Sequence, residues 1–155
     1  VFVANPPRLQ QLIDVYETYG GPVLPAIKTN AEGTKKYGII EGKKIGDRVM
    51  SVQSLLEKPG PDKAPSLWAS VSGYVLTPDI FPILAQTKRG KGGEVWLTDA
   101  LQVLASRRAM YAAMVDATYY DMGSKLGFLK ANIEFALRRP ELKGELRRYL
   151  KTITR

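Results

Sequence analysis

Helical and extended patterns alternate along this sequence, and that alternation constrains the fold more than any other feature. Residues 8–19 carry apolar side chains at helical spacing, whereas residues 22–29 form an apolar stretch about one strand long. The same change of period recurs to the end of the chain. Such alternation is typical of an α/β domain, in which helices cover the faces of a sheet. With 155 residues, the chain is long enough for one such domain with its own core.

Turn and capping residues set the expected boundaries of these elements. Asn5, before two prolines, predicts a capped helix start, and Gly20 predicts its end. Pro25 predicts an edge strand or a bulge, because proline has no N–H to donate to a ladder. We expect a turn at Glu41-Gly42 and a helix cap at Ser124. The expected strands are 22–29, 37–40, 49–58, 68–76 and 109–115, and the expected helices are 5–19, 78–84, 94–105, 124–137 and 141–152.

The chain has no cysteine and no histidine. Their absence excludes thiol nucleophiles, disulfides, His-ligated zinc and imidazole general-base catalysis. The remaining carboxylates, amines, guanidinium groups and backbone amides suit positioning and charge stabilisation better than covalent catalysis. The lack of cysteine fits a reducing cytosol. No apolar run approaches the roughly 20 residues of a membrane span, so we expect no membrane partner.

Positive charge is concentrated near the C-terminus. The net charge is +8, and residues 138–155 hold seven basic and two acidic side chains. A basic tail can bind nucleic acid, but no RNA-binding signature appears elsewhere in the sequence. We therefore favour a solvated helix face for this tail. Polyanionic small substrates would account for the remaining positive charge equally well.

Polar or glycine residues at the ends of four segments are candidates for chemistry, because ligands of open α/β sheets bind at strand ends. Gly38 indicates either a bulge or a close approach of a ligand to the backbone. Glu57 and Lys58 could hold a sugar hydroxyl and a phosphate, or face solvent as ordinary charges. The bases and glycines of 89–94 could receive an anion or form a flexible connector. Asp121 could ligate Mg²⁺ or cap the turn that follows.

Five segments in order resemble one enzyme family. They are YGII at 37–40, LLEKP followed by APS at 55–66, GYVLTPDIF at 73–81, GGEVWLTDAL at 92–101 and YDMGSKLGFLKANIEFALRRPEL at 120–142. Together they resemble the bacterial-type UTP–glucose-1-phosphate uridylyltransferases. The resemblance runs from about Pro7 to the C-terminus. Five segments in the same order are far more specific than any one of them.

The resemblance implies a fold and a reaction. The fold is a three-layer α/β/α, Rossmann-like nucleotidyltransferase fold with a mixed sheet. The reaction joins UTP and glucose 1-phosphate to give UDP-glucose and pyrophosphate, by in-line attack of the sugar phosphate. The implied substrates are a sugar 1-phosphate and a nucleoside triphosphate. The family is cytoplasmic, and we expect a homo-oligomer.

The resemblance also implies roles for individual residues. Gly38 matches the glycine whose backbone lies against the sugar, and Glu57 matches the acid that accepts hydrogen bonds from the sugar hydroxyls. Lys58 matches the base on the sugar's phosphate and is the candidate catalytic residue. Asp121 matches a carboxylate that holds Mg²⁺ between the phosphates. Tyr74 matches the tyrosine after the sugar-side strand.

The sequence departs from the family pattern at three places. Leu67 follows the APS segment where the family has Asn, and Ser72-Gly73 stands where it has Gly-Arg. Ser124 stands before the lysine of the KLG segment, where the family often has an acid. These changes bear on the fine contacts to the sugar and leave the implied fold intact.

A further departure is an absent segment. The family's glycine-rich phosphate loop and its first metal carboxylate precede the helix that is expected from Asn5, and no comparable loop occurs in this sequence. We therefore expect that residues 1–155 are the sugar-phosphate-binding C-terminal part of a single nucleotidyltransferase domain that lacks its N-terminal part. Basic helices at 124–155 belong to this part. We expect no uridylyl transfer by these residues alone.

Two other functions remain open at this point. One is a thymidylyltransferase-type relative that uses another base or sugar, because the base-reading residues are not in this sequence. The other is a non-catalytic sugar-phosphate binding or assembly module, with the basic tail as its docking element.

Overall fold

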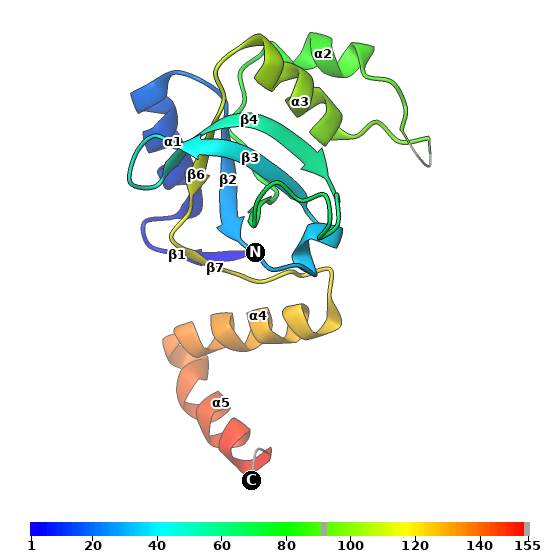
Figure 1. Cartoon of the computed structure of the whole chain (residues 1–155). Helices are drawn as coiled ribbons and strands as arrows, with labels where there is room; N and C mark the ends of the chain where they lie inside the picture. The colour runs from blue at the N-terminus through cyan, green and yellow to red at the C-terminus, as the bar shows by residue number, and fades with distance from the viewer. Residues whose placement is uncertain (91–92, 154–155) are drawn as a thin grey trace. The chain divides into compact units, whose positions relative to one another are not determined.

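The structure, a computed structural model, describes residues 1–90 and 93–153 in two compact units (Figure 1). The larger unit is formed by residues 4–116, and the smaller by residues 1–3 and 117–155. Lys91 and Gly92 of the expected anion-binding loop lie outside the described residues, as does Arg155 of the basic tail.

Five strands of the larger unit form a mixed sheet. They are β2 (Val23–Lys28), β3 (Gly38–Lys44), β4 (Val49–Glu57), β5 (Trp68–Ser70) and β6 (Tyr111–Met114). The order is β2-β5-β3-β4-β6, and β6 returns to pair with β2, so that the hydrogen-bonding pattern closes on itself. Only the β2–β6 pair is parallel, and the others are antiparallel. The mixed sheet confirms the expectation, whereas its closure was not foreseen.

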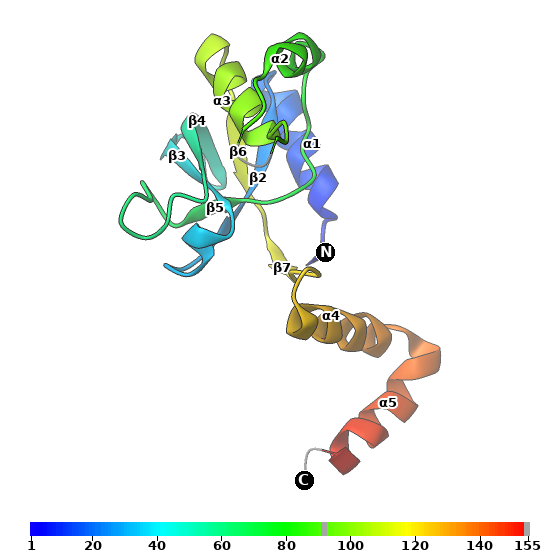
Figure 2. The same ribbon diagram turned by 90° about the vertical axis from the view of Figure 1, so that its right-hand side faces the viewer.

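Helices cover both faces of strand β2. Helix α1 (Arg8–Tyr19) lies beside β2 and β6 (Figures 1 and 2). Its Leu12 packs in one apolar cluster with Val23 of β2 and Ala113 of β6. The neighbouring Leu24 belongs to a second apolar cluster with side chains of α2 (Ile80–Gln86) and α3 (Leu97–Arg107). Successive side chains of a strand point to opposite faces, so Val23 and Leu24 enter different clusters. This arrangement is the expected α/β/α layering.

The turn expected at Glu41-Gly42 is wrong, because β3 continues through it to Lys44. The register between β3 and β4 shifts by one residue at this point, where Gln53 of β4 has no partner. This is a β-bulge. The actual turn of the hairpin follows Ile45, whose N–H donates to the Val49 carbonyl at 2.9 Å.

The edge-strand alternative for Pro25 is also wrong, since β2 pairs on both sides. The ladder with β5 stops at Ala26 and resumes only at the Val23–Val75 bridge, with the register shifted by two residues. Pro25 lies in this gap, where no N–H is needed. The expected strand 68–76 is therefore shortened to Trp68–Ser70, followed by irregular backbone.

Several helix boundaries differ from those expected. Helix α1 is preceded by Pro7, and no side chain caps it, so the expected cap at Asn5 is wrong. Helix α3 begins at Leu97 rather than Glu94. Ser124 caps α4 (Lys125–Arg138) as expected, because its Oγ accepts a hydrogen bond from the Gly127 N–H at 3.0 Å. Pro140 opens α5 (Pro140–Ile153) in the first turn, where proline is tolerated.

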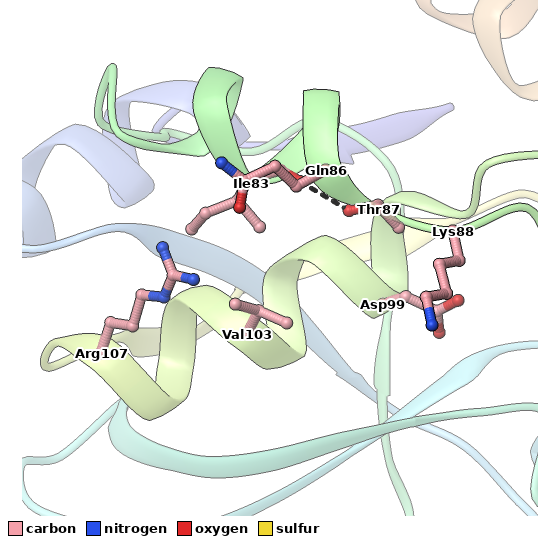
Figure 3. Close-up of a pocket in the computed structure, with 7 residues that line it drawn as sticks. All are labelled: Ile83, Gln86, Thr87, Lys88, Asp99, Val103 and Arg107. Carbon is pink, nitrogen blue, oxygen red and sulfur yellow. Dashed lines mark hydrogen bonds between the residues drawn. The ribbon is translucent and has the colours of Figure 1, made fainter.

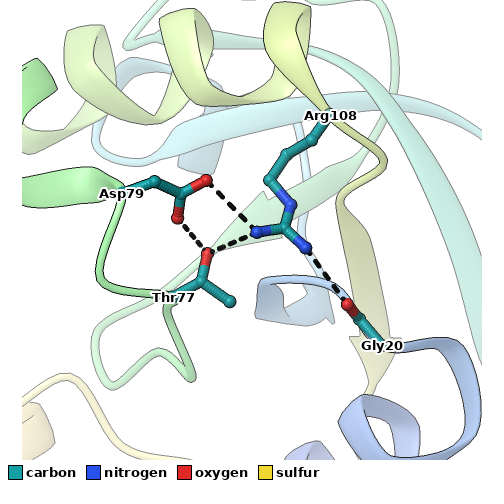
Figure 4. Close-up of polar contacts among 4 residues, drawn as sticks. All are labelled: Gly20, Thr77, Asp79 and Arg108. Atoms are coloured by element: carbon teal, nitrogen blue, oxygen red, sulfur yellow. Dashed lines mark hydrogen bonds and ion pairs between the residues drawn. The ribbon is translucent and has the colours of Figure 1, made fainter.

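A polar cluster joins three helix ends of the larger unit (Figure 4). The Arg108 guanidinium donates to the Asp79 carboxylate, the Thr77 hydroxyl and the Gly20 carbonyl, each at 3.2 Å. The Thr77 hydroxyl also donates to Asp79. That hydrogen bond and the adjacent Arg108 hold the pKa of Asp79 below its ordinary value. The cluster fixes the ends of α1 and α3 and the start of α2.

The smaller unit contains a two-stranded sheet and two helices. Strands β1 (Phe2–Ala4) and β7 (Ala117–Tyr119) pair, and the rings of Phe2 and Tyr119 lie 4.9 Å apart. Strand β7 was missed because its three residues show no periodicity. Helices α4 and α5 carry large exposed apolar side chains, which are Leu126, Phe128, Leu129, Ile133, Phe135, Leu142, Tyr149 and Ile153. Within the described residues, no helix has the length and apolar character needed to cross a membrane.

Gly42 provides a test of the bulge. A Cβ at this position would overlap the backbone carbonyl oxygen of Ser51, which cannot move without disturbing the ladder. We expect Gly42→Ala to lower the free energy of unfolding by about 1–3 kcal/mol, as overpacking typically does. Urea denaturation followed by circular dichroism measures this change.

Gly144→Ala is the matched control for that substitution. Gly144 lies within α5, and the nearest atom to its added Cβ is 3.9 Å away. Alanine also favours a helix over glycine. The control should be at least as stable as the unsubstituted protein, and equal stability of both variants would contradict the account of the bulge.

Candidate functional site

The candidate site lies on a row of residues that crosses the sheet. Ala26 of β2 faces Ser70 of β5, Ser70 faces Gly38 of β3, and Gly38 faces Glu57 of β4. Residues paired in register share one face of a sheet. The Glu57 and Ser70 side chains therefore stand on the same face, with Gly38 between them.

Gly38 leaves this row without a side chain at its middle. A Cβ at Gly38 would lie 3.4 Å from Glu57 Oε2, 3.6 Å from Leu55 Cδ1 and 3.8 Å from Thr98 Cγ2. A methyl group would just fit, but any longer side chain would meet Glu57 or Thr98. Gly38 is itself buried, and its lack of a side chain leaves room for the Glu57 and Thr98 side chains to meet beside it. The bulge alternative for Gly38 is wrong, since the bulge lies four residues further on, whereas a close approach of a ligand to Gly38 stays a prediction.

Helix α3 covers the end of β4 on the side away from β3. Strand β6 pairs with β4 only from Val49 to Ser51, so the last part of β4 has no strand neighbour there. The Gln102 side chain takes the place of that neighbour and accepts a hydrogen bond from the Leu55 N–H at 2.6 Å. Because α3 is held against β4 in this way, Thr98 in its first turn reaches Glu57.

Glu57 is held by two polar contacts. Its Oε2 accepts a hydrogen bond from the Thr98 hydroxyl at 2.7 Å, and its Oε1 lies 3.2 Å from the Lys58 ammonium. The Glu57 side chain is 20% exposed and that of Lys58 is 55% exposed. The carboxylate is thus oriented but still accessible, and it can accept further hydrogen bonds from a ligand.

Lys58 has an unusual backbone conformation. Its φ is 44°, in the left-handed region that residues other than glycine rarely adopt. The Lys58 N–H donates to the Tyr37 carbonyl at 3.2 Å, which ties this conformation to the residue before Gly38. The chain leaves β4 here, and the exposed ammonium stands beside Glu57 as a positive charge of the kind that suits a phosphate.

Tyr74 lies near the same row. Burial raises the pKa of its hydroxyl, with the negative charge of Glu57 adding to the rise, while Ser70 and Arg8 oppose it. The phenol is therefore protonated at neutral pH. The Arg8 guanidinium donates to the carbonyls of Ser72 and Gly73 at 2.7 and 2.6 Å, and so fixes the backbone that leads to Tyr74.

Asp121 belongs to the smaller unit, in the turn before α4. Its Oδ1 accepts a hydrogen bond from the Gly123 N–H at 3.0 Å, and its carbonyl accepts one from the Ser124 hydroxyl at 3.1 Å. Across residues 1–90 and 93–153, no three acidic side chains gather as a metal site. Mg²⁺ commonly takes only one or two carboxylates and completes its shell with phosphates and water, so Asp121 fits as one oxygen ligand.

The larger unit thus brings together four of the predicted site residues, Gly38, Glu57, Lys58 and Tyr74. Sequence reasoning missed Thr98 and Ser70. Thr98 stands in one of the segments that carry the family resemblance, which was the available signal. Its hydrogen bond to Glu57 depends on a return of the chain over 41 residues, which no local pattern reveals.

A separate hollow lies between α2 and α3 (Figure 3). It has a volume of about 330 Å³ and is lined by Ile83, Gln86, Thr87, Lys88, Asp99, Val103 and Arg107. Arg107 lies at one end, and Lys88 and Asp99 lie at the other. The residues that line it include none of the predicted site residues, so this hollow is distinct from the row at Gly38.

Comparisons with known proteins agree with the fold. A Bacillus subtilis UTP–glucose-1-phosphate uridylyltransferase is 39% identical over 153 residues, which cover 99% of this chain and 52% of that protein. A crystal structure of UDP-glucose pyrophosphorylase complexed with UDP-glucose has a TM-score of 0.80 at 35% identity, covering 84% of this chain and 50% of the other. A UTP-bound enzyme of the same name from Acinetobacter baumannii has a TM-score of 0.80 at 28% identity, covering 92% and 49%.

This chain corresponds to only part of each relative. The chain spans about half the length of the curated relatives that it matches. The model of the family described as Nucleotidyl transferase matches residues 3–137, which include every predicted site residue. On this match, the chain belongs to the nucleotidyl transferase family.

Proposed function

We propose that this chain supplies the sugar-phosphate side of an enzyme that forms UDP-glucose and pyrophosphate from UTP and glucose 1-phosphate. The observation that carries the proposal is the juxtaposition of Gly38, Glu57 and Lys58, in which a backbone position without a side chain lies beside an oriented carboxylate and an exposed ammonium. The names of the similar uridylyltransferases support the same reaction.

The row at Gly38 would hold the sugar. With no side chain at Gly38, the glucose ring can lie against the backbone of β3. Glu57 is 20% exposed and already anchored by Thr98, so it can accept hydrogen bonds from sugar hydroxyls without losing its orientation. Tyr74 adds a protonated hydroxyl near this face.

Lys58 would hold the phosphate of glucose 1-phosphate. A phosphate oxygen attacks the α-phosphorus of UTP in line, a new P–O bond forms, and the bond to pyrophosphate breaks. Lys58 neutralises the attacking phosphate and keeps it aligned, which lowers the barrier by orientation and charge stabilisation. No protein nucleophile is required, in agreement with a chain that has no cysteine or histidine.

Mg²⁺ would be the cofactor, and Asp121 would be its ligand from this chain. When bound, Mg²⁺ neutralises charge on the phosphates. The carboxylate of Asp121 supplies the hard oxygen that this ion prefers. Both units would then be parts of one nucleotidyltransferase domain, with the basic helices 124–155 included, and the protein would act in the cytoplasm.

The direct test measures pyrophosphate release by the full-length protein with UTP and glucose 1-phosphate. We expect turnover that requires Mg²⁺ and stops when the ion is removed with a chelator. Replacing UTP by TTP should lower kcat/KM, and equal use of TTP would favour a thymidylyltransferase instead. Absence of turnover with any nucleoside triphosphate would contradict the proposal.

Substitution of Lys58 separates function from folding. Lys58→Ala and Lys58→Gly both remove the ammonium, and we expect each to lower kcat by about 100-fold or more, as loss of a charge-stabilising group does. Glycine also adopts the left-handed backbone of this position without strain. The urea midpoint of Lys58→Gly should therefore be equal to or higher than that of Lys58→Ala. Activity within a few-fold of the unsubstituted enzyme would remove Lys58 from the mechanism.

Thr98 is expected to act through Glu57 as a positioning residue. Thr98→Val keeps the shape of the side chain but removes the donor, and we expect KM for glucose 1-phosphate to rise about fivefold with little change in KM for UTP. Thr98→Ser restores the hydroxyl and should restore KM. Equal effects of Val and Ser would show that packing, not the hydrogen bond, is responsible.

We further propose that the protein is a homo-oligomer, with the apolar side chains of α4 and α5 at the contact between copies. Exposed apolar faces of this extent are characteristic of association surfaces. Sedimentation equilibrium measures the mass in solution. Leu129→Glu and Ile133→Glu, placed on one face of α4, should shift the protein toward the monomer, and a monomeric unsubstituted protein would contradict the proposal.

A further inference from the structure

Ser70 has a buried hydroxyl that lacks a full hydrogen bond within the fold. The residue is 8% exposed, and among the described residues its Oγ has no partner that meets the distance and angle of a hydrogen bond. The Tyr74 hydroxyl is its polar neighbour, because hydrogen bonding by Ser70 lowers the pKa of Tyr74, but the contact between the two hydroxyls falls short of those criteria. Buried hydroxyl groups are normally paired, so an unpaired one calls for a partner from outside the fold.

The register of the sheet places this hydroxyl opposite Glu57. Ser70 faces Gly38 on β5, and Gly38 faces Glu57 on β4. Neighbouring strands are about 4.8 Å apart, so the two polar side chains flank the glycine across about 10 Å. A single sugar ring with its hydroxyls can bridge this span. On its other side Ser70 faces Ala26, which offers no polar group.

We propose that Ser70 is a specificity-determining residue, whose hydroxyl binds one sugar hydroxyl on the side of Gly38 opposite Glu57. This inference rests on the proposed function, because it takes the ligand over Gly38 to be a hexose 1-phosphate. A serine hydroxyl can both donate and accept, and so can a sugar hydroxyl, so the pair forms without a change of charge.

The consequence is a preference for sugars that carry the bound hydroxyl. A site built to bind a hydroxyl rejects an analogue that lacks it, because the buried group of the protein is then left unpaired. Glu57 alone cannot impose this preference on the far side of the ring, since it stands on the other side of Gly38.

The test compares Ser70→Ala with the unsubstituted full-length enzyme. The measurement is kcat/KM for glucose 1-phosphate and for its 2-, 3-, 4- and 6-deoxy analogues. We expect the substitution to lower kcat/KM about five- to tenfold for glucose 1-phosphate, the effect of one lost hydrogen bond. One deoxy analogue should be insensitive to the substitution, because it already lacks the hydroxyl that Ser70 binds.

Ser54→Ala is the matched control. Ser54 also lies in the sheet, but its hydroxyl donates to Glu41 at 2.6 Å, outside the row at Gly38. The control should leave kcat/KM unchanged for every sugar, and urea denaturation should show that both variants remain folded. An equal loss for all sugars, or no loss for any, would overturn the inference alone. Absence of turnover by the unsubstituted enzyme would overturn the proposed function and this inference with it.

Discussion

The pairing of Gly38 with Glu57 is the constraint on which the rest of the site depends. In this register the carboxylate stands next to the one position of the row that has no side chain. A slip by one residue would turn Glu57 to the opposite face. The bulge at Gly42 lies in the same pair of strands, so it contributes to fixing the register that the site requires.

Helix α3 orients the Glu57 carboxylate, which the strand register places next to Gly38. Gln102 binds the free edge of β4 at Leu55, and Thr98 binds Glu57 itself. The buried face of the same helix, with Leu101 and Leu104, belongs to the apolar cluster on one side of β2. Apolar packing thus fixes α3 against the sheet, and the hydrogen bonds of Gln102 and Thr98 hold the end of β4 and the Glu57 carboxylate in place.

Much of the fold was predictable from the sequence, because long segments such as 8–19 and 49–57 show clear periodicity and end at glycine or proline. The errors at Pro25 and Glu41 share a physical cause. Each residue was judged by its local preference, whereas its conformation depends on a strand partner elsewhere in the sequence. Gly38, Glu57 and Lys58 were predicted from their places at strand ends, and the family resemblance gave them their expected roles. Thr98 and Ser70 were not predicted, because a threonine in a helix and a serine in a strand are ordinary until the sheet register is known.

The central claim is that the row at Gly38 binds the sugar. A crystal structure of the full-length protein with UDP-glucose tests it most directly. We expect the glucose ring to lie over Gly38, with hydroxyls within hydrogen-bonding distance of Glu57 and the sugar's phosphate next to Lys58. A glucose moiety bound elsewhere, or separated from Gly38 by a side chain, would contradict the account.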